Sequence, residues 1–125
     1  MENQLTLIVA AKWQQFMNSK NIEEMLKLTH EQIEFAHLNE YGYGHKELAD
    51  WILRTGLTLT TLKSFVNEDR LLLRHLARWK GEDGSFLKEE SFYSYIKLSR
   101  GKIIYIARID NQHDAAVISG ISLET

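Results

Sequence analysis

Apolar residues recur along this chain at two spacings, first that of helices and later that of strands. Near the start every third or fourth residue is apolar, which predicts a helix that ends near residues 18–20. Its apolar face consists of Leu5, Ile8, Val9, Trp13, Phe16 and Met17. Asn21 is followed three residues later by Glu24, as in a capping box, so we expect a short second helix to begin there.

Strict alternation replaces the helical spacing after the second helix. Residues 32–37 predict a short strand with Ile33, Phe35 and His37 on one face. We expect residues 39–44 to form a loop. A third helix is predicted over residues 45–55, with Gly56 as its stop.

Beyond Gly56 the chain contains four long strand-like runs joined by short polar connections. The runs cover residues 57–66, 70–80, 86–98 and 102–110. Short connections between long strands favour hairpins, so we expect a meandering antiparallel sheet. Helices followed by strands indicate an α+β fold in which the helices pack on one face of a curved sheet. With 125 residues and no linker or repeat, residues 1–125 are predicted to form one domain.

Composition excludes several classes of function. The absence of cysteine rules out disulfides, thiolate metal sites and cysteine nucleophiles. A formal charge of −2 gives no general attraction to nucleic acid or to an anionic membrane. No apolar run approaches the roughly 18 residues that span a bilayer, and the first residues do not resemble a signal peptide, so we expect a cytoplasmic protein. No histidine pair has the spacing of a zinc site, so neither a metal nor another cofactor is expected.

Arg108 is the charged residue that fits its surroundings least. It shares one face of the last predicted strand with Ile104, Ile106 and Asp110, and arginine is seldom buried unless it is paired. Three interpretations stay open. Arg108 pairs with Glu90, or it binds an anionic group of a ligand by two parallel hydrogen bonds, or it is exposed to solvent.

The order of the elements resembles the nuclear transport factor 2-like superfamily, in particular its SnoaL-like and ketosteroid isomerase-like branches. The resemblance covers nearly the whole chain and rests on four segments: residues 13–21 (WQQFMNSKN), 32–37 (QIEFAH), 44–52 (GHKELADWI) and 101–103 (GKI). It implies a cone-shaped, curved antiparallel sheet wrapped around three N-terminal helices, a cystatin-like arrangement with a pocket between sheet and helices. It also implies a homodimer formed through the outer face of the sheet, on which we place Tyr93, Tyr95, Ile103, Tyr105, Ala107 and Ile109.

The resemblance also allows a comparison of catalytic residues. Ketosteroid isomerases use a tyrosine on the first helix, an aspartate base at the end of the first strand and a protonated aspartate on a later strand. The matching residues here are Trp13, His37 and Ser94, so none of the three is kept. Many SnoaL-like sequences carry an acidic residue seven places after the glycine that opens the last strand, and here that place holds Arg108. The usual catalytic acids of the superfamily are therefore missing.

Two histidines are candidates for a role in the pocket. His37 shares the face of Ile33 and Phe35 toward the pocket mouth, where a neutral imidazole would act as a general base; the alternative is a hydrogen-bonded histidine at a strand end. His75 lies on the uncharged face of its strand, so it lines the pocket or is a satisfied core histidine.

Two functions are compatible with these residues. The first is a SnoaL-like pocket protein that binds a small, largely apolar molecule, with or without an anionic group. The second is a small-molecule isomerase, lyase or cyclase in which His37 is the base and Trp13, Ser94 or Arg108 polarises the substrate. The predicted ligand-binding residues are Trp13, Phe16, Trp51, His75, Glu90, Ser94 and Arg108.

Overall fold

The helices at the start of the chain follow the predicted pattern. The computed structural model describes residues 2–37, 40–54 and 56–121, without the side chains of residues 2, 3, 37 and 40. Helix α1 spans Glu2–Ser19, α2 spans Ile22–Lys27 and α3 spans Gly44–Arg54. The side chain of Asn21 accepts a hydrogen bond from the backbone N–H of Glu24 at 3.4 Å. This bond satisfies one of the free donors at the start of α2, as the capping pattern predicts.

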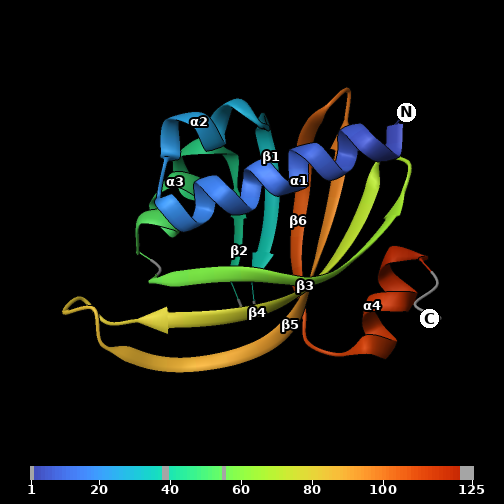
Figure 1. Ribbon diagram of the computed structural model, residues 1–125. Helices are drawn as coiled ribbons and strands as arrows, with labels where there is room; N and C mark the ends of the chain where they lie inside the picture. The colour runs from blue at the N-terminus through green and yellow to red at the C-terminus, as the bar shows by residue number, and fades with distance from the viewer. Residues whose placement is uncertain (1, 38–39, 55, 122–125) are drawn as a thin grey trace.

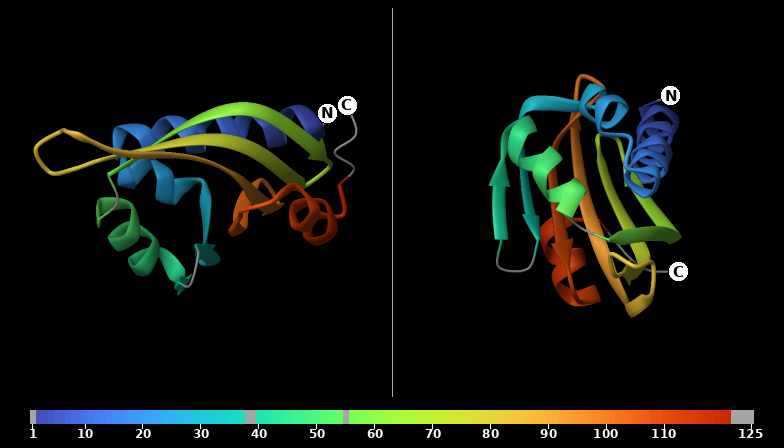
Figure 2. Two further views of the ribbon diagram at one scale, coloured as in Figure 1. Left: turned by 90° about the horizontal axis from the view of Figure 1, so that it is seen from below. Right: turned by 90° about the vertical axis from the view of Figure 1, so that its left-hand side faces the viewer.

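Six strands form one curved, open sheet in the order β2-β1-β6-β5-β4-β3 (Figure 1). The strands are β1 (Thr29–His37), β2 (Glu40–Tyr43), β3 (Leu57–Asn67), β4 (Arg70–Lys80), β5 (Phe86–Ser99) and β6 (Lys102–Ile109). Strands β3 to β6 meander antiparallel, as the short connections predict. The α+β class and the curved sheet are therefore confirmed. Figure 2 shows the long β4–β5 hairpin curving and extending beyond the helices.

The structure departs from the predicted fold in three ways. Strand β1 pairs parallel with β6, so the sheet is mixed and not purely antiparallel. Residues 40–43, predicted as a loop, form β2 and pair antiparallel with β1. Gly42 serves close packing there and not a turn, because a Cβ on it would lie 2.0 Å from Cζ of Phe35. A fourth helix, α4 (Gln112–Ser119), follows the last strand and was not predicted.

Successive residues along a strand point to opposite faces of the sheet, and each face has its own hydrophobic core. Leu71 and Leu73 join the main core beneath α1, α2 and α3, whereas Leu72 between them joins a smaller core beneath α4. This is the alternation of faces expected of a strand. The smaller core consists of Leu72, Tyr95, Ile109, Ala115 and Ile121. Helix α4 therefore covers part of the outer face that we predicted to be an interface.

Ile103 does not lie on the outer face, and its predicted place there is wrong. It is completely buried in the main core, and its backbone N–H donates to the carbonyl of Leu28 at 2.8 Å. The β5–β6 pairing shifts register between Lys97 and Leu98. Such an irregularity breaks the simple alternation from which the face of Ile103 was inferred.

The C-terminal end of α1 is fixed to the edge strand β3. Asn18 donates through Nδ2 to the carbonyl of Leu59 and accepts through Oδ1 from its N–H, both at 2.8 Å. Lys20 Nζ donates to the carbonyl of Leu57 at 3.0 Å. These bonds hold the apolar face of α1, with Trp13 and Met17, against the sheet. None of the described helices is long and apolar enough to cross a membrane.

Candidate functional site

A pocket lies between the helices and the concave side of the sheet. Its lining residues come from α1, α3 and four strands: Trp13, Met17, Phe35, Ala36, Leu48, Trp51, Leu57, Leu59, Phe92, Ser94, Ile106 and Arg108. The cavity measures about 30 Å³, room for about two water molecules. Ser94 and Arg108 supply the polar groups of an otherwise apolar and aromatic wall.

The start of α3 is tied to β1, which positions the helical side of the pocket. His45 Nε2 lies 2.9 Å from the hydroxyl of Thr29 and 3.2 Å from its carbonyl oxygen. This contact sets the face of α3 that buries Leu48 and half-buries Trp51. The Trp51 ring packs against Phe35 with 6.0 Å between ring centres.

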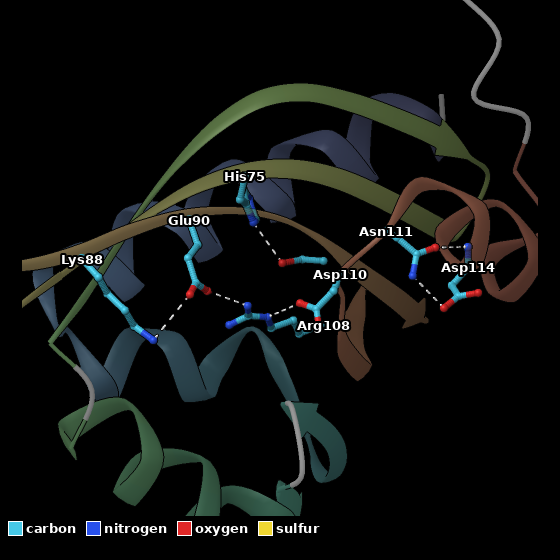
Figure 3. A network of polar contacts seen from close by, with 8 residues as sticks. His75, Lys88, Glu90, Arg108, Asp110, Asn111 and Asp114 are labelled. Atoms are coloured by element: carbon cyan, nitrogen blue, oxygen red, sulfur yellow. Dashed lines mark hydrogen bonds and ion pairs between the residues drawn. The ribbon is translucent and has the colours of Figure 1, made fainter.

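Arg108 is buried and paired with two carboxylates (Figure 3). Its side chain is 8% exposed; Nη2 lies 2.8 Å from Glu90 Oε2, and Nε lies 2.8 Å from Asp110 Oδ1. The guanidinium carbon sits 4.4 Å from the centre of the Phe92 ring, a distance suited to cation–π attraction. The predicted pair with Glu90 is present in the structure, and the interpretation of Arg108 as solvent-exposed is wrong.

One nitrogen of Arg108 is left without a partner. Nη1 is buried and has no hydrogen-bond partner within the described ranges. Both carboxylates that fix the guanidinium are more exposed than it is, at 40% for Glu90 and 59% for Asp110. Lys88 Nζ lies 3.7 Å from the second oxygen of Glu90. The hydrogen bond from Arg108 lowers the pKa of Glu90, so this carboxylate is ionised at neutral pH.

His75 and Ser94 form a buried pair next to the pocket, and Figure 3 shows His75 with its hydrogen bond as a dashed line. Nδ1 of His75 lies 2.9 Å from the Ser94 hydroxyl oxygen, and the imidazole is completely buried. Its ring packs edge-on to Phe92. Burial lowers the pKa of His75 to about 4, so the ring is neutral at neutral pH. Nε2 has no hydrogen-bond partner among the described residues.

The structure sorts the predicted ligand-binding residues into three groups. Those that line the pocket are Trp13, Trp51, Ser94 and Arg108. His75 and Glu90 reach it indirectly, through Ser94 and Arg108 respectively. Phe16 is half-buried and packs against the main core. The side chain of His37 lies outside the described part of the structure, so its predicted role stays a prediction.

Sequence reasoning missed most of the apolar wall. The missed residues are Met17, Phe35, Ala36, Leu48, Leu57, Leu59, Phe92 and Ile106. Alternation marked several of them as inward-facing, but nothing local to a strand separates a pocket residue from a core residue. No group of three or more histidine, aspartate or glutamate side chains that could hold a metal occurs in the described part of the chain.

The sequence matches no family model and no curated protein. The structure, in contrast, matches many solved ones. A putative polyketide cyclase from Xanthomonas campestris pv. campestris matches with a TM-score of 0.77 and 12% identity, over 91% of this chain and 96% of that chain. A putative ketosteroid isomerase from Kribbella flavida matches with a TM-score of 0.76 and 12% identity, over 90% of this chain and 82% of that chain. A computationally designed 17-OHP binder matches with a TM-score of 0.73 and 15% identity, over 87% of this chain and 92% of that chain.

The chain has the nuclear transport factor 2-like fold. Other neighbours are described only as NTF2-like proteins of unknown function, from Cytophaga hutchinsonii among other sources. Within the nuclear transport factor 2-like fold, the pocket occupies the place that the resemblance implies, between sheet and helices. At such low identities the likeness shows the fold alone, so the function must be argued from the side chains in the pocket.

Proposed function

We propose that this protein binds a small, largely apolar molecule in the pocket and holds an acceptor group of that molecule at Nη1 of Arg108. The orientation of Arg108 carries the proposal. Glu90, Asp110 and Phe92 fix the guanidinium, and its remaining nitrogen is left buried and unpaired. An unsatisfied buried donor costs about 1–3 kcal/mol, and a ligand acceptor at Nη1 would remove that cost. No acidic catalytic residue of the superfamily is needed for this role.

The apolar wall supports a ligand with an apolar body. Aromatic and aliphatic side chains surround the two polar groups, which is the usual composition of a small-molecule site. The designed 17-OHP binder supports the proposal by showing that the fold accommodates small-molecule binding. Because the cavity measures about 30 Å³, a ligand larger than a few atoms must displace a lining side chain. Trp51, a half-buried aromatic on α3, is the side chain that we propose moves.

Ligand binding can be tested with three probes of similar shape. Acetophenone carries a neutral acceptor, benzoate an anionic one and ethylbenzene none, and Trp13 and Trp51 in the pocket wall report binding by their fluorescence. We expect acetophenone or benzoate to bind more tightly than ethylbenzene. Arg108→Met should weaken binding of the favoured acceptor by about tenfold or more, the scale of one charge-assisted hydrogen bond.

Arg74→Met is the matched control, since Arg74 is an exposed arginine on β4 that does not line the pocket. The double variant Arg108→Met/Glu90→Gln guards against a fold weakened by an unpaired Glu90. The proposal fails if the acceptor probes bind no better than ethylbenzene, or if their affinities survive the loss of Arg108 in a folded variant.

The catalytic alternative, an isomerase, lyase or cyclase that uses His37 as general base, stays a prediction. If it is correct, His37→Ala abolishes turnover and leaves the fold intact. Retained turnover of a substrate by the folded variant would rule this base out.

The homodimer implied by the resemblance is also part of the proposal. Helix α4 covers the sheet around Tyr95 and Ile109, which leaves Tyr93 and Tyr105 half-buried beside it. A second copy would have to use this smaller remainder of the outer face. Light scattering during size-exclusion chromatography would give the mass directly, and a monomer at high concentration would contradict the dimer. A cytoplasmic location and the lack of a nucleic-acid partner stay predictions.

A further inference from the structure

We infer that the polar end of the pocket, formed by Arg108 and Ser94, binds a neutral carbonyl oxygen of the ligand. This oxygen accepts hydrogen bonds from Nη1 of Arg108 and from the hydroxyl of Ser94. His75 acts as a positioning residue, because its bond to Ser94 leaves the serine hydrogen free for the ligand. This inference rests on the proposed function and names the class of its ligand.

The two donors lie together because of the sheet register. Ser94 on β5 is the direct antiparallel partner of Arg108 on β6. Residues directly opposite each other place their side chains on the same face, with Cβ atoms roughly 4.5–5.5 Å apart. Both residues line the pocket. The register therefore places both residues at the same end of the pocket, where we infer that one ligand oxygen accepts from both.

The charge around Arg108 favours a neutral acceptor over a carboxylate. Arg108 already has the carboxylates of Glu90 and Asp110 at 2.8 Å from two of its nitrogens. The ammonium group of Lys88 lies 3.7 Å from the Glu90 carboxylate. The two positive and two negative charges of this cluster cancel. A ligand carboxylate would add an unbalanced negative charge next to Glu90, inside an apolar pocket where such a charge is costly. A ketone oxygen accepts the same hydrogen bonds without adding charge.

The hydrogen bond between His75 and Ser94 determines which way the serine hydroxyl can act. If Nδ1 accepted the serine hydrogen, Nε2 would carry a buried N–H without a partner. If Nδ1–H donates to the serine oxygen, the unpaired Nε2 is only an unused acceptor. Buried donors without a partner are the rarer of the two in native proteins. We therefore assign the proton to Nδ1, so the Ser94 hydroxyl donates to the pocket.

The test uses acetophenone, benzoate and ethylbenzene, titrated at about pH 8, where benzoate is fully ionised. We expect acetophenone to bind about tenfold more tightly than benzoate and several-fold more tightly than ethylbenzene. Ser94→Ala should reduce the preference for acetophenone over ethylbenzene by about fivefold. The same titrations in Trp51→Ala remove the limit of space, with Trp13 as the reporter.

The role of His75 is tested through the same preference and not through stability. His75→Phe keeps the ring but removes the donor, so the acetophenone-to-ethylbenzene ratio should fall while ethylbenzene binds as before. His75→Asn offers a side-chain N–H near the place of Nδ1–H and should restore part of the ratio. If His75→Phe does not fold, Ser94→Ala still tests the second donor.

The outcomes separate this inference from the proposed function. Preference for benzoate, lost in Arg108→Met, would support the proposed function and overturn the neutral carbonyl. Preference for acetophenone that survives Ser94→Ala, or survives a folded His75→Phe, would overturn the second donor or its positioning. Affinities that do not depend on Arg108 in any folded variant would overturn both.

Discussion

Arg108 is buried more deeply than most arginines because neighbouring carboxylates neutralise its charge. Glu90 and Asp110 meet two of its nitrogens, and the centre of the Phe92 ring lies 4.4 Å from its guanidinium carbon. The sequence allowed the pair of Arg108 with Glu90 as one of three interpretations. It could not predict the free Nη1, because that depends on the cross-strand register and on which nitrogen each carboxylate reaches.

His75 illustrates the same limit. Its uncharged strand face predicted burial, which the structure confirms. Its contact with Ser94 could not be predicted, since the two residues lie on different strands and the partner of a buried histidine depends on tertiary packing.

His75 should make the stability of the protein depend on pH. Burial lowers its pKa from 6.5 to about 4, so between these values the unfolded chain binds a proton that the folded protein does not. The contribution of His75 to the free energy of unfolding is therefore complete above about pH 6.5 and is lost as the pH falls toward 4. This contribution differs by about 3 kcal/mol between the two ends of that range. Urea unfolding of the wild type and His75→Phe at several pH values should show a flatter pH dependence in the variant.

Glu90 is the internal control for that comparison. Its lowered pKa makes its contribution fall as the pH drops below its usual range, in the same direction as His75, but it is present in both proteins and cancels. Equal pH dependence in the two proteins between pH 4 and 6.5 would contradict the assignment to His75.

Among the elements, α1 owes its position to its last turn as well as to its apolar face. Asn18 supplies the exposed edge of β3 with both a donor and an acceptor, in place of a neighbouring strand. The apolar spacing predicted the helix and its inward face. The role of Asn18 was not predictable, because its partner Leu59 lies 41 residues away.

Asn18→Ala should lower the free energy of unfolding by about 1–3 kcal/mol, since it leaves both backbone groups of Leu59 without their protein partner. Gln15→Ala, at an exposed position of the same helix, is the matched control and should change stability by about 0.5 kcal/mol or less. Urea denaturation measures both. Equal effects of the two substitutions would show that the bonds to Leu59 contribute nothing.

Helix α4 escaped prediction because its apolar residues do not mark one buried face. Ala115 is buried, whereas Val117 is 67% and Ile118 54% exposed. Its caps are nevertheless regular: Asn111 accepts from the Asp114 N–H at 2.8 Å, and Gly120 closes the helix with φ of 70°. Arg70 Nη1 adds a hydrogen bond to the Ser119 carbonyl at 2.9 Å.

The packing of α4 on the sheet can be tested with two acidic substitutions two residues apart. Ala115→Asp places an unpaired charge in the core with Tyr95 and Ile109 and should cost about 3 kcal/mol or more. Val117→Asp introduces the same side chain on the exposed side and should cost little. Thermal unfolding of both variants measures the contrast. Similar losses would mean that α4 does not pack on the sheet as described.

At the scale of the whole molecule, the sequence predicted the class and the order of most elements but not how β1 joins the rest of the sheet. Each hairpin from β3 to β6 follows from its own short connection. The β1–β6 pairing joins strands that are separated by about half of the chain, and no local pattern encodes it. The same pairing makes the first part of the chain depend on the last.

A fragment of residues 1–56 should therefore not fold. It lacks β3, on which α1 packs, and β6, the parallel partner of β1. Its helices would lose the packing of their apolar faces on the sheet, and such tertiary packing supplies most helical stability in proteins. Circular dichroism during heating should show no cooperative transition for the fragment and a single one for the full chain. A cooperative transition in the fragment would show that the first half forms a unit of its own.

The parallel pairing of β1 and β6 also bears on how the molecule withstands mechanical force. The two strands run side by side in one direction, with Glu34 opposite Tyr105 and Ala36 opposite Ala107 (Figure 1). When the two ends of the chain are pulled apart, tension enters β1 at its start and β6 at its end, on opposite sides of the paired region. The bonds between them are then sheared together, whereas a hairpin pulled at its ends opens one bond at a time.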